Sequence, residues 1–205
     1  MHKPLQERSR KTLDRLVLAA EKLLESKNWS DIGIADISTT SQVSVGSFYA
    51  RFSDKEALLD YLDDRYTEEI QSRIEQNASS IVKASSLTLA ATTLTDNIFD
   101  FFSSKKGLVR ALVMRAREGD KGAALRTQRM TAALPQIIDA FETHREEIVH
   151  VDWRQAVSEA IAVASHSIRE QLLFPQSLAL KLPEERLRSL LARFLVSHLT
   201  TPEER

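Results

Sequence analysis

The chain has 205 residues, of which 42% are hydrophobic and 28% charged, with a net charge of −1, values that suit a globular protein and exclude a low-complexity chain. It has no cysteine, which excludes disulfides, thiolate zinc sites and cysteine nucleophiles. No run of eighteen apolar residues occurs and the N-terminus lacks the apolar segment of a signal peptide, so we expect a cytoplasmic protein without a membrane span.

The charge is unevenly distributed along the chain. Residues 1–53 carry eight Lys/Arg and six Asp/Glu, a balance of +2, and the remaining residues have a balance of −3. In the first eleven residues four basic side chains, Arg10 and Lys11 among them, oppose only Glu7. A short basic arm can lie on nucleic-acid phosphates. A solvated chain terminus explains the same residues equally well, so both interpretations stay open.

The N-terminal part of the chain shows apolar residues at helical spacing. This spacing predicts helices over about residues 10–26, 33–40 and 45–51. Ser44 can cap the third helix by accepting a bond from a free backbone N–H. Ser53 and Glu56 form an S-x-x-E capping box, which predicts that a long fourth helix begins here and ends near residue 77.

The rest of the chain continues the helical pattern, and no segment has the alternation of a strand. Helices are expected near 86–103, 106–117, 124–148, 152–173 and 184–200. Pro135 is expected either to kink or to divide the helix over 124–148. The sequence therefore predicts an all-α fold of about nine helices, with one domain over residues 1–53 and a helical bundle over 54–205.

The third predicted helix has an unusual composition for its length. Gly46 lies near its start, although Gly in a helix costs about 1 kcal/mol relative to Ala. Three short helices with a tight turn between the second and third are typical of a helix-turn-helix, whose third helix enters the major groove. A glycine there allows the backbone to approach DNA closely.

We expect the DNA contacts to come from the basic arm, the start of the second helix, the third helix and the start of the fourth. The candidate residues are Arg10, Lys11, Gly33, Ser44, Val45, Gly46, Ser47, Tyr49, Arg51 and Lys55. For Ser47 a purely structural role in the first helical turn explains its position equally well, and for Arg51 simple solvation does. The apolar residues Trp29, Phe48 and Phe52 are expected in the core.

The sequence IADIS at 34–38 followed by VSVGSFYARFSDKEAL at 43–58 resembles the DNA-binding domain of the tetracycline-repressor (TetR) family of transcriptional regulators. The resemblance covers about residues 8–65 and strengthens the case for Tyr49 as a phosphate contact. Family members usually have Thr followed by Ser or Thr where this chain has Ile32 and Gly33, and Ala-Gly in the turn where it has Ser41 and Gln42. A position that is often His is Ala50 here, which removes a phosphate contact and leaves a methyl group that can touch thymine.

The resemblance also implies a ligand cavity among the helices of residues 86–173. Large apolar residues there more often belong to a core. The available polar anchors, Arg110, Arg115, Arg117 and His166, favour an acidic or hydrogen-bond-accepting ligand. The candidate pocket residues are Phe99, Phe102, Met114, Arg117, Met130, Trp153 and His166. No cofactor is expected, and an isolated E-x-x-H step at Glu147 and His150 is a poor metal site without partners on other helices.

Two helices carry the signals of a homodimer interface. Small residues surround His166 on the helix over 153–173, and a Leu/Phe stripe follows the helix over 184–200. We therefore expect a dimeric, ligand-responsive repressor that a small molecule releases from double-stranded operator DNA. An all-α enzyme is the alternative, although no catalytic motif supports it, and a helix-turn-helix used only for protein contacts is another. Salt-dependent DNA binding would separate the first function from the other two.

Overall fold

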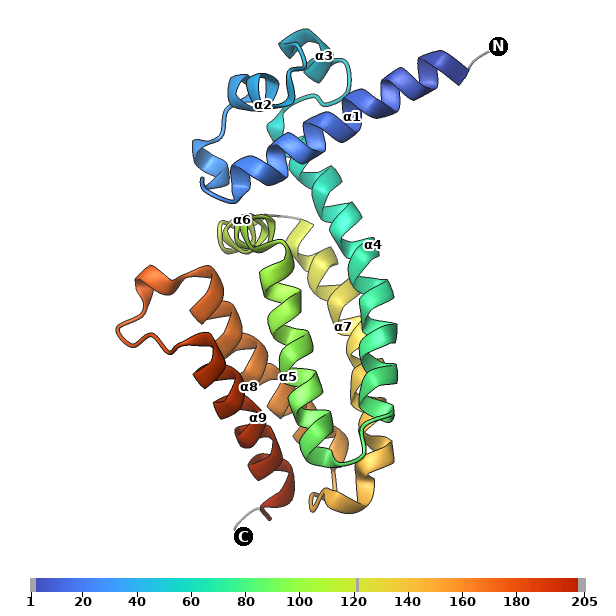
Figure 1. The fold of residues 1–205 in the computed structure, drawn as a ribbon, viewed down its shortest axis with the longest axis vertical. Helices are drawn as coiled ribbons and strands as arrows, with labels where there is room; N and C mark the ends of the chain where they lie inside the picture. The colour runs from blue at the N-terminus through green and yellow to red at the C-terminus, as the bar shows by residue number, and fades with distance from the viewer. Residues whose placement is uncertain (1–2, 121, 203–205) are drawn as a thin grey trace. The chain divides into compact units, whose positions relative to one another are not determined.

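Figure 1 shows the computed structural model, which describes residues 3–120 and 122–202, without the side chains of residues 3–6, 8, 122–127, 129 and 130. The described residues contain no strand, which confirms the all-α prediction. The helices are α1 (Lys3–Leu24), α2 (Ile34–Ser41), α3 (Val45–Tyr49), α4 (Lys55–Val82), α5 (Leu87–Ser104), α6 (Lys106–Arg117), α7 (Gly122–Ala140), α8 (Trp153–Leu173) and α9 (Glu184–Thr200), with short 3-10 helices at Trp29–Asp31, Phe141–Glu147 and Pro175–Ser177. None of these helices combines the length and the apolar character needed to cross a membrane.

The contacts within the chain divide it into two units. The first unit comprises the described residues up to Thr67 together with Lys105–Asp120, and the second comprises Glu68–Ser104 with the described residues from 122 onward. α4 contributes residues to both units because it is one continuous helix, and α6 belongs to the first. The units are defined by contacts, so the boundary of independent domains between residues 53 and 54 stays a prediction.

The first unit is built on the buried faces of α1, α2 and α3. α1 packs against α2, with Leu16, Ala20 and Leu24 buried at helical spacing. Phe48 of α3 is fully buried and contacts the ring of Phe52 at a centroid distance of 5.6 Å. Trp29 and Phe52 are also buried, which confirms that these three aromatic residues belong to the core.

The start of α4 differs from the predicted capping box. The Oδ1 atom of Asp54, not a Ser53 oxygen, accepts the backbone N–H of Ala57 at 2.8 Å. The Glu56 side chain accepts a bond from Trp29 Nε1 at 2.9 Å, so it is drawn away from the helix end. The predicted S-x-x-E cap is therefore wrong, because a charged carboxylate one residue later is the better acceptor for free N–H groups.

α6 packs closely on the end of α1 within the first unit. A Cβ atom at Gly107 would overlap the carbonyl oxygen of Leu24, so this position requires glycine. An ion pair joins Lys105 Nζ to Glu21 Oε1 at 3.0 Å, and Arg110 Nη2 donates to the Lys27 carbonyl at 3.1 Å. These contacts fix the start of α6 to the last turn of α1 and to the residues that follow α1.

The second unit is organised around α5, which packs against both α8 and α9. The described backbone of α7 continues through Pro135 and ends at Ala140, so the proline does not divide the helix. The Leu stripe of α9, formed by Leu187, Leu191, Leu195 and Leu199, is buried within the protomer. These four leucines are therefore covered by α5 and α8 and are not free for a second copy, whereas Leu190 of the same predicted stripe is 41% exposed.

Candidate nucleic-acid interface

α3 presents one face to solvent and buries the other. Val45 is 45% exposed and Tyr49, one helical turn later, is 55% exposed. Phe48 lies on the opposite face and anchors the helix in the core, where the Tyr49 ring meets it edge-on at 5.7 Å. The result is a short exposed helix face held rigidly by a single buried aromatic side chain.

Two of the predicted contact residues hold the start of this helix together. The Oγ atom of Ser44 accepts the backbone N–H of Ser47 at 3.1 Å, which confirms the predicted cap. The hydroxyls of Ser44 and Ser47 also share a hydrogen bond of 2.9 Å. Both side chains therefore have a structural role, and a base or phosphate contact by either stays a prediction.

Gly46 lies in open space on the exposed face. A Cβ atom added there would have no atom within 4 Å, apart from the neighbouring helix backbone. Packing within this protein therefore does not require glycine at position 46. Because Gly is unfavourable in a helix, its presence points to a surface that approaches from outside.

Arg15, which sequence analysis did not identify, stabilises the turn before α3 by contacting Gln42. Gln42 has φ 54° and ψ 36°, the left-handed conformation that glycine adopts more easily. Arg15 Nη2 donates to the Gln42 carbonyl at 2.8 Å, which ties α1 to the turn. The two residues are 27 positions apart, so no local pattern indicates this contact.

Arg51 contacts α1 instead of being solvated. Its Nη2 atom donates to the carbonyl oxygen of Ser9 at 2.5 Å and lies 2.9 Å from the Ser9 hydroxyl. The predicted basic arm is helical here, since α1 begins at Lys3, and Arg10 and Lys11 are exposed on it. Lys11 forms an ion pair with Glu7 at 2.9 Å. Phosphate contacts by these three basic residues stay predictions.

Lys55 is engaged with the backbone of the Trp29–Asp31 turn. Its Nζ atom lies 2.9 Å from the Trp29 carbonyl oxygen and 3.0 Å from that of Ile32. The ammonium group also lies 5.5 Å from the centroid of the Trp29 ring. Lys55 therefore stabilises the chain between α1 and α2, and its contact with phosphate stays a prediction.

Two carboxylates cap helix starts in the first unit and are electrostatically perturbed. The N–H of Gly33 donates to Asp36 Oδ2 at 2.9 Å, and this bond, together with nearby Lys27, lowers the pKa of Asp36 below its usual value. The N–H of Ala57 and the Ser53 hydroxyl lower the pKa of Asp54 in the same way. The amide of Gly33 is therefore occupied, and its contact with DNA stays a prediction.

The predicted ligand-pocket residues do not gather in one place. Phe99, Phe102 and Trp153 are buried in the second unit, whereas His166 is exposed on α8 and its Nδ1 lies 2.7 Å from the Ala162 carbonyl oxygen. Met114 and Arg117 are exposed on α6 in the first unit. The side chain of Met130 lies outside the described residues. A shared ligand site for these residues stays a prediction.

Two of the arginines considered as ligand anchors have structural partners. Arg110 donates to the Lys27 carbonyl, as described above. Arg115 lies 2.8 Å from Asp60 Oδ1 and 3.2 Å from Asp120 Oδ2, with Glu56 and Asp63 slightly farther away. This arginine joins α6 to the first turns of α4 within the first unit.

The predicted E-x-x-H region has a structural role at the α4–α5 connection. His144 is buried, with Nε2 3.1 Å from the Ile81 carbonyl oxygen near the end of α4. Glu147 Oε1 accepts the backbone N–H of Leu87 at the start of α5 at 2.9 Å and lies 3.5 Å from His144 Nδ1. Both side chains therefore satisfy backbone groups that a helix leaves free at its ends.

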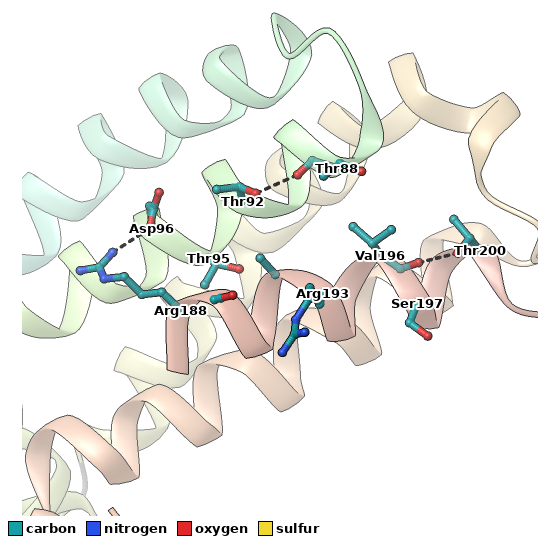
Figure 2. A pocket seen from close by; sticks show the side chains of 11 residues that line it. Thr88, Thr92, Thr95, Asp96, Arg188, Arg193, Val196, Ser197 and Thr200 are labelled. Atoms are coloured by element: carbon teal, nitrogen blue, oxygen red, sulfur yellow. Dashed lines mark hydrogen bonds and ion pairs between the residues drawn. The ribbon is translucent and has the colours of Figure 1, made fainter. Parts of the chain in front are cut away.

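A groove of about 720 Å³ lies between α5 and α9 (Figure 2). Threonines line its α5 side, and the hydroxyls of Thr92 and Thr95 donate to carbonyls of their own helix at 2.9 Å. Arg188 is paired with Asp96 at 2.8 Å and with Glu184 at 2.6 Å, and it covers the Phe99 ring at 4.1 Å. The charge of Arg188 and the hydroxyls of Thr92 and Thr95 are thus satisfied within the protein.

The exposed third helix, the tight turn before it and the all-α architecture define a helix-turn-helix DNA-binding protein. Residues 16–62 match the family described as bacterial regulatory proteins, tetR family. The match covers the helix-turn-helix region, so this part of the chain is similar to the DNA-binding part of these transcription regulators.

Solved structures resemble the chain over nearly its whole length. The TetR family regulator PfmR from Thermus thermophilus is 12% identical with a TM-score of 0.62, covering 93% of this chain and 100% of that one. A TetR-family regulator from Mesorhizobium loti is 17% identical with a TM-score of 0.65, covering 94% and 96%. The fatty acid degradation regulator FadR from Bacillus halodurans is 15% identical with a TM-score of 0.58, covering 91% and 97%. At these identities the likeness is one of fold, and a comparison with curated protein sequences finds no match.

Proposed function

We propose that this protein is a cytoplasmic repressor that binds operator DNA as a homodimer and leaves it when a small molecule binds. The observation that carries the proposal is the exposed face of α3, where Val45 and Tyr49 flank a glycine with open space above it. A major groove admits such a helix, and side chains at its first turn reach base edges while the flanking basic groups contact phosphates.

The proposed dimer uses the outer faces of α8 and α9. The Leu stripe of α9 is buried within the protomer, but Val163 of α8 and Leu190 of α9 are 45% and 41% exposed. A two-fold interface repeats every contact, so a small set of exposed apolar residues is used twice. Two-fold symmetry presents two copies of α3 to two half-sites, about 34–36 Å apart if they are one helical turn of DNA apart.

The proposed coupling between effector and DNA runs through α4. This helix is continuous from Lys55 to Val82 and contributes to both units, so a shift of its second half reaches the residues next to the helix-turn-helix. The effector must bind the DNA-free form more tightly than the DNA-bound form. A 5- to 150-fold loss of DNA affinity requires a difference of about 1–3 kcal/mol between the two forms.

The substitution Gly46→Ala tests the DNA-binding part of the proposal. The free protein should become more stable by up to about 1 kcal/mol, since Ala is the better helix former and the added methyl meets no atom. Affinity for operator DNA should fall at the same time, because the methyl holds α3 away from the groove. The DNA is first selected from fragments of the source genome, and affinity is then measured at several salt concentrations. Unchanged affinity would contradict the close approach assigned to Gly46, and the absence of salt-dependent binding to any DNA would favour the alternative of a protein-interaction module.

A further inference from the structure

A second groove, of about 450 Å³, lies between the second half of α4 and the last turns of α5, both of which belong to the second unit. Ile70, Arg73 and Ile74 line the α4 side, and Asn97 and Phe101 line the α5 side. Its volume is in the range of small-molecule sites. Two polar side chains in its lining, Asn97 and Arg73, determine what it can bind.

The first such group is the amide of Asn97. Its Nδ2 atom is buried and has no hydrogen-bond partner among the residues that the structure describes. Buried donors are almost always paired in native proteins, and an unpaired one lowers stability. Asn97 lines the groove, so a bound molecule supplies the acceptor when this buried amide turns toward it.

The second group is the guanidinium of Arg73. Arg73 is exposed, and no carboxylate of the described chain lies within ion-pair distance of it. Arg188, which lines the other groove, is by contrast paired on two sides. A planar guanidinium with free donors matches a carboxylate, which it can bind through two parallel hydrogen bonds.

The other residues that line the groove determine which chemical groups the ligand has besides a carboxylate. Ile70 is buried, Ile74 and Phe101 are half-buried, and all three offer apolar surface beside the polar groups. Asp100 also lines the groove, but its Oδ1 lies 3.9 Å from Arg188 and its side chain is mostly exposed to water. Its repulsion of an anion is therefore reduced by a neighbouring cation and by solvent.

We infer that this groove binds a small organic carboxylate with an apolar body, held by Arg73 and the Asn97 amide and packed on Ile74 and Phe101. The inference rests on the proposed function, since such a ligand is the class of effector to which the regulator would respond. The arginines that sequence analysis considered for an acidic ligand lie elsewhere, and Arg73 was not among them.

The experiment uses the full chain, with sodium octanoate and sodium 4-phenylbutyrate as probes and their primary amides as neutral counterparts. A carboxylate at millimolar concentration should raise the Tm by about 2–4 °C or more, and the amide should do less. Arg73→Gln should weaken carboxylate binding about tenfold or more, because it removes the charge-assisted bonds. Arg193→Gln is the matched control, since this exposed arginine lines the other groove, and it should bind as the unaltered protein does.

A second variant distinguishes a loss of ligand binding from a loss of folding. Asn97→Leu keeps the side-chain volume and removes the unpaired donor, so the free protein should gain about 2–4 °C in Tm while the carboxylate binds several-fold more weakly. Three outcomes would overturn the inference. They are that neither carboxylate binds, that the amide binds as well as the acid, or that Arg73→Gln binds like the unaltered protein.

DNA release separates this inference from the proposed function. If a carboxylate binds through Arg73 but leaves DNA affinity unchanged, the groove assignment stands and release of the repressor by this ligand is contradicted. If another class of molecule releases DNA equally from the unaltered protein and from Arg73→Gln, the proposed function stands and the groove assignment is overturned.

Discussion

Gln42 is strained at the turn that orients α3, and the strain can be tested directly. Among the residues that the structure describes, it is the non-glycine residue with a positive φ. A left-handed conformation costs an L-residue roughly 1–2 kcal/mol, and glycine adopts it freely but is more mobile when unfolded. We therefore expect Gln42→Gly to raise the free energy of unfolding by about 0.5–1 kcal/mol in urea titrations. Gln42→Ala keeps the strain and should give no gain, and equal stability of the two variants would contradict the argument.

Arg51 is expected to affect DNA binding through Ser9 and the adjacent arm, and not by its own contact with DNA. If so, Arg51→Ala alone should lower DNA affinity. The same substitution should have little further effect in a variant in which Arg10 and Lys11 are both alanine. A direct phosphate contact predicts additive losses instead, with a decrease of about 1 in the salt slope for each contact. DNA titrations on the four members of this double-mutant cycle distinguish the two cases.

At the level of elements, the contact between α6 and α1 depends on one position. Gly107→Ala places a methyl on the Leu24 carbonyl, so α6 must shift away from the end of α1. Overpacking of this kind typically costs about 1–3 kcal/mol, and a clash with backbone has no flexible side chain to absorb it. Urea unfolding should show this loss, whereas Gly46→Ala, a helical glycine in open space, should show none. Equal stability of the two variants would mean that α6 is not held tightly at Gly107.

The capping carboxylates predict how α2 and α4 respond to acid. The pKa values of Asp36 and Asp54 are lowered in the folded protein, chiefly by backbone N–H bonds from Gly33 and Ala57. Their stabilising effect is therefore complete above the unfolded Asp pKa of about 3.9 and is lost as the pH falls through the lower folded values. Asp54→Asn keeps a capping oxygen without the titration, so its stability should change less between pH 6 and pH 3, which circular dichroism at both values would measure. An equally steep loss would assign the acid sensitivity to other groups.

The elements show what a sequence can reveal. Helix periodicity and the Ser44 cap are local signals, so the helix over 184–200 and the start of α3 were predicted correctly. Sequence analysis assigned the cap of α4 to Ser53 and not to Asp54. Both side chains can accept a helix N–H, and only the backbone geometry determines which of them does. Arg51 and Lys55 find partners 42 and 26 residues away, and the unpaired amide of Asn97 follows from how α4 and α5 lie together. No spacing rule indicates these contacts.

For the whole molecule, the decisive prediction concerns assembly. The buried Leu stripe leaves Val163 and Leu190 as exposed apolar residues on α8 and α9. The double substitution of both by Glu should give a monomer in light scattering, since charges at a two-fold contact face their own copies. The same protein should bind a two-half-site operator at least about tenfold more weakly, because the second half-site is no longer bound by a linked subunit. Val82→Glu, a similarly exposed residue at the end of α4, is the control and should remain dimeric. If the double variant stays a dimer with full affinity, the interface lies elsewhere, and if the unaltered protein is itself a monomer, DNA recognition by a preformed two-fold pair must be abandoned.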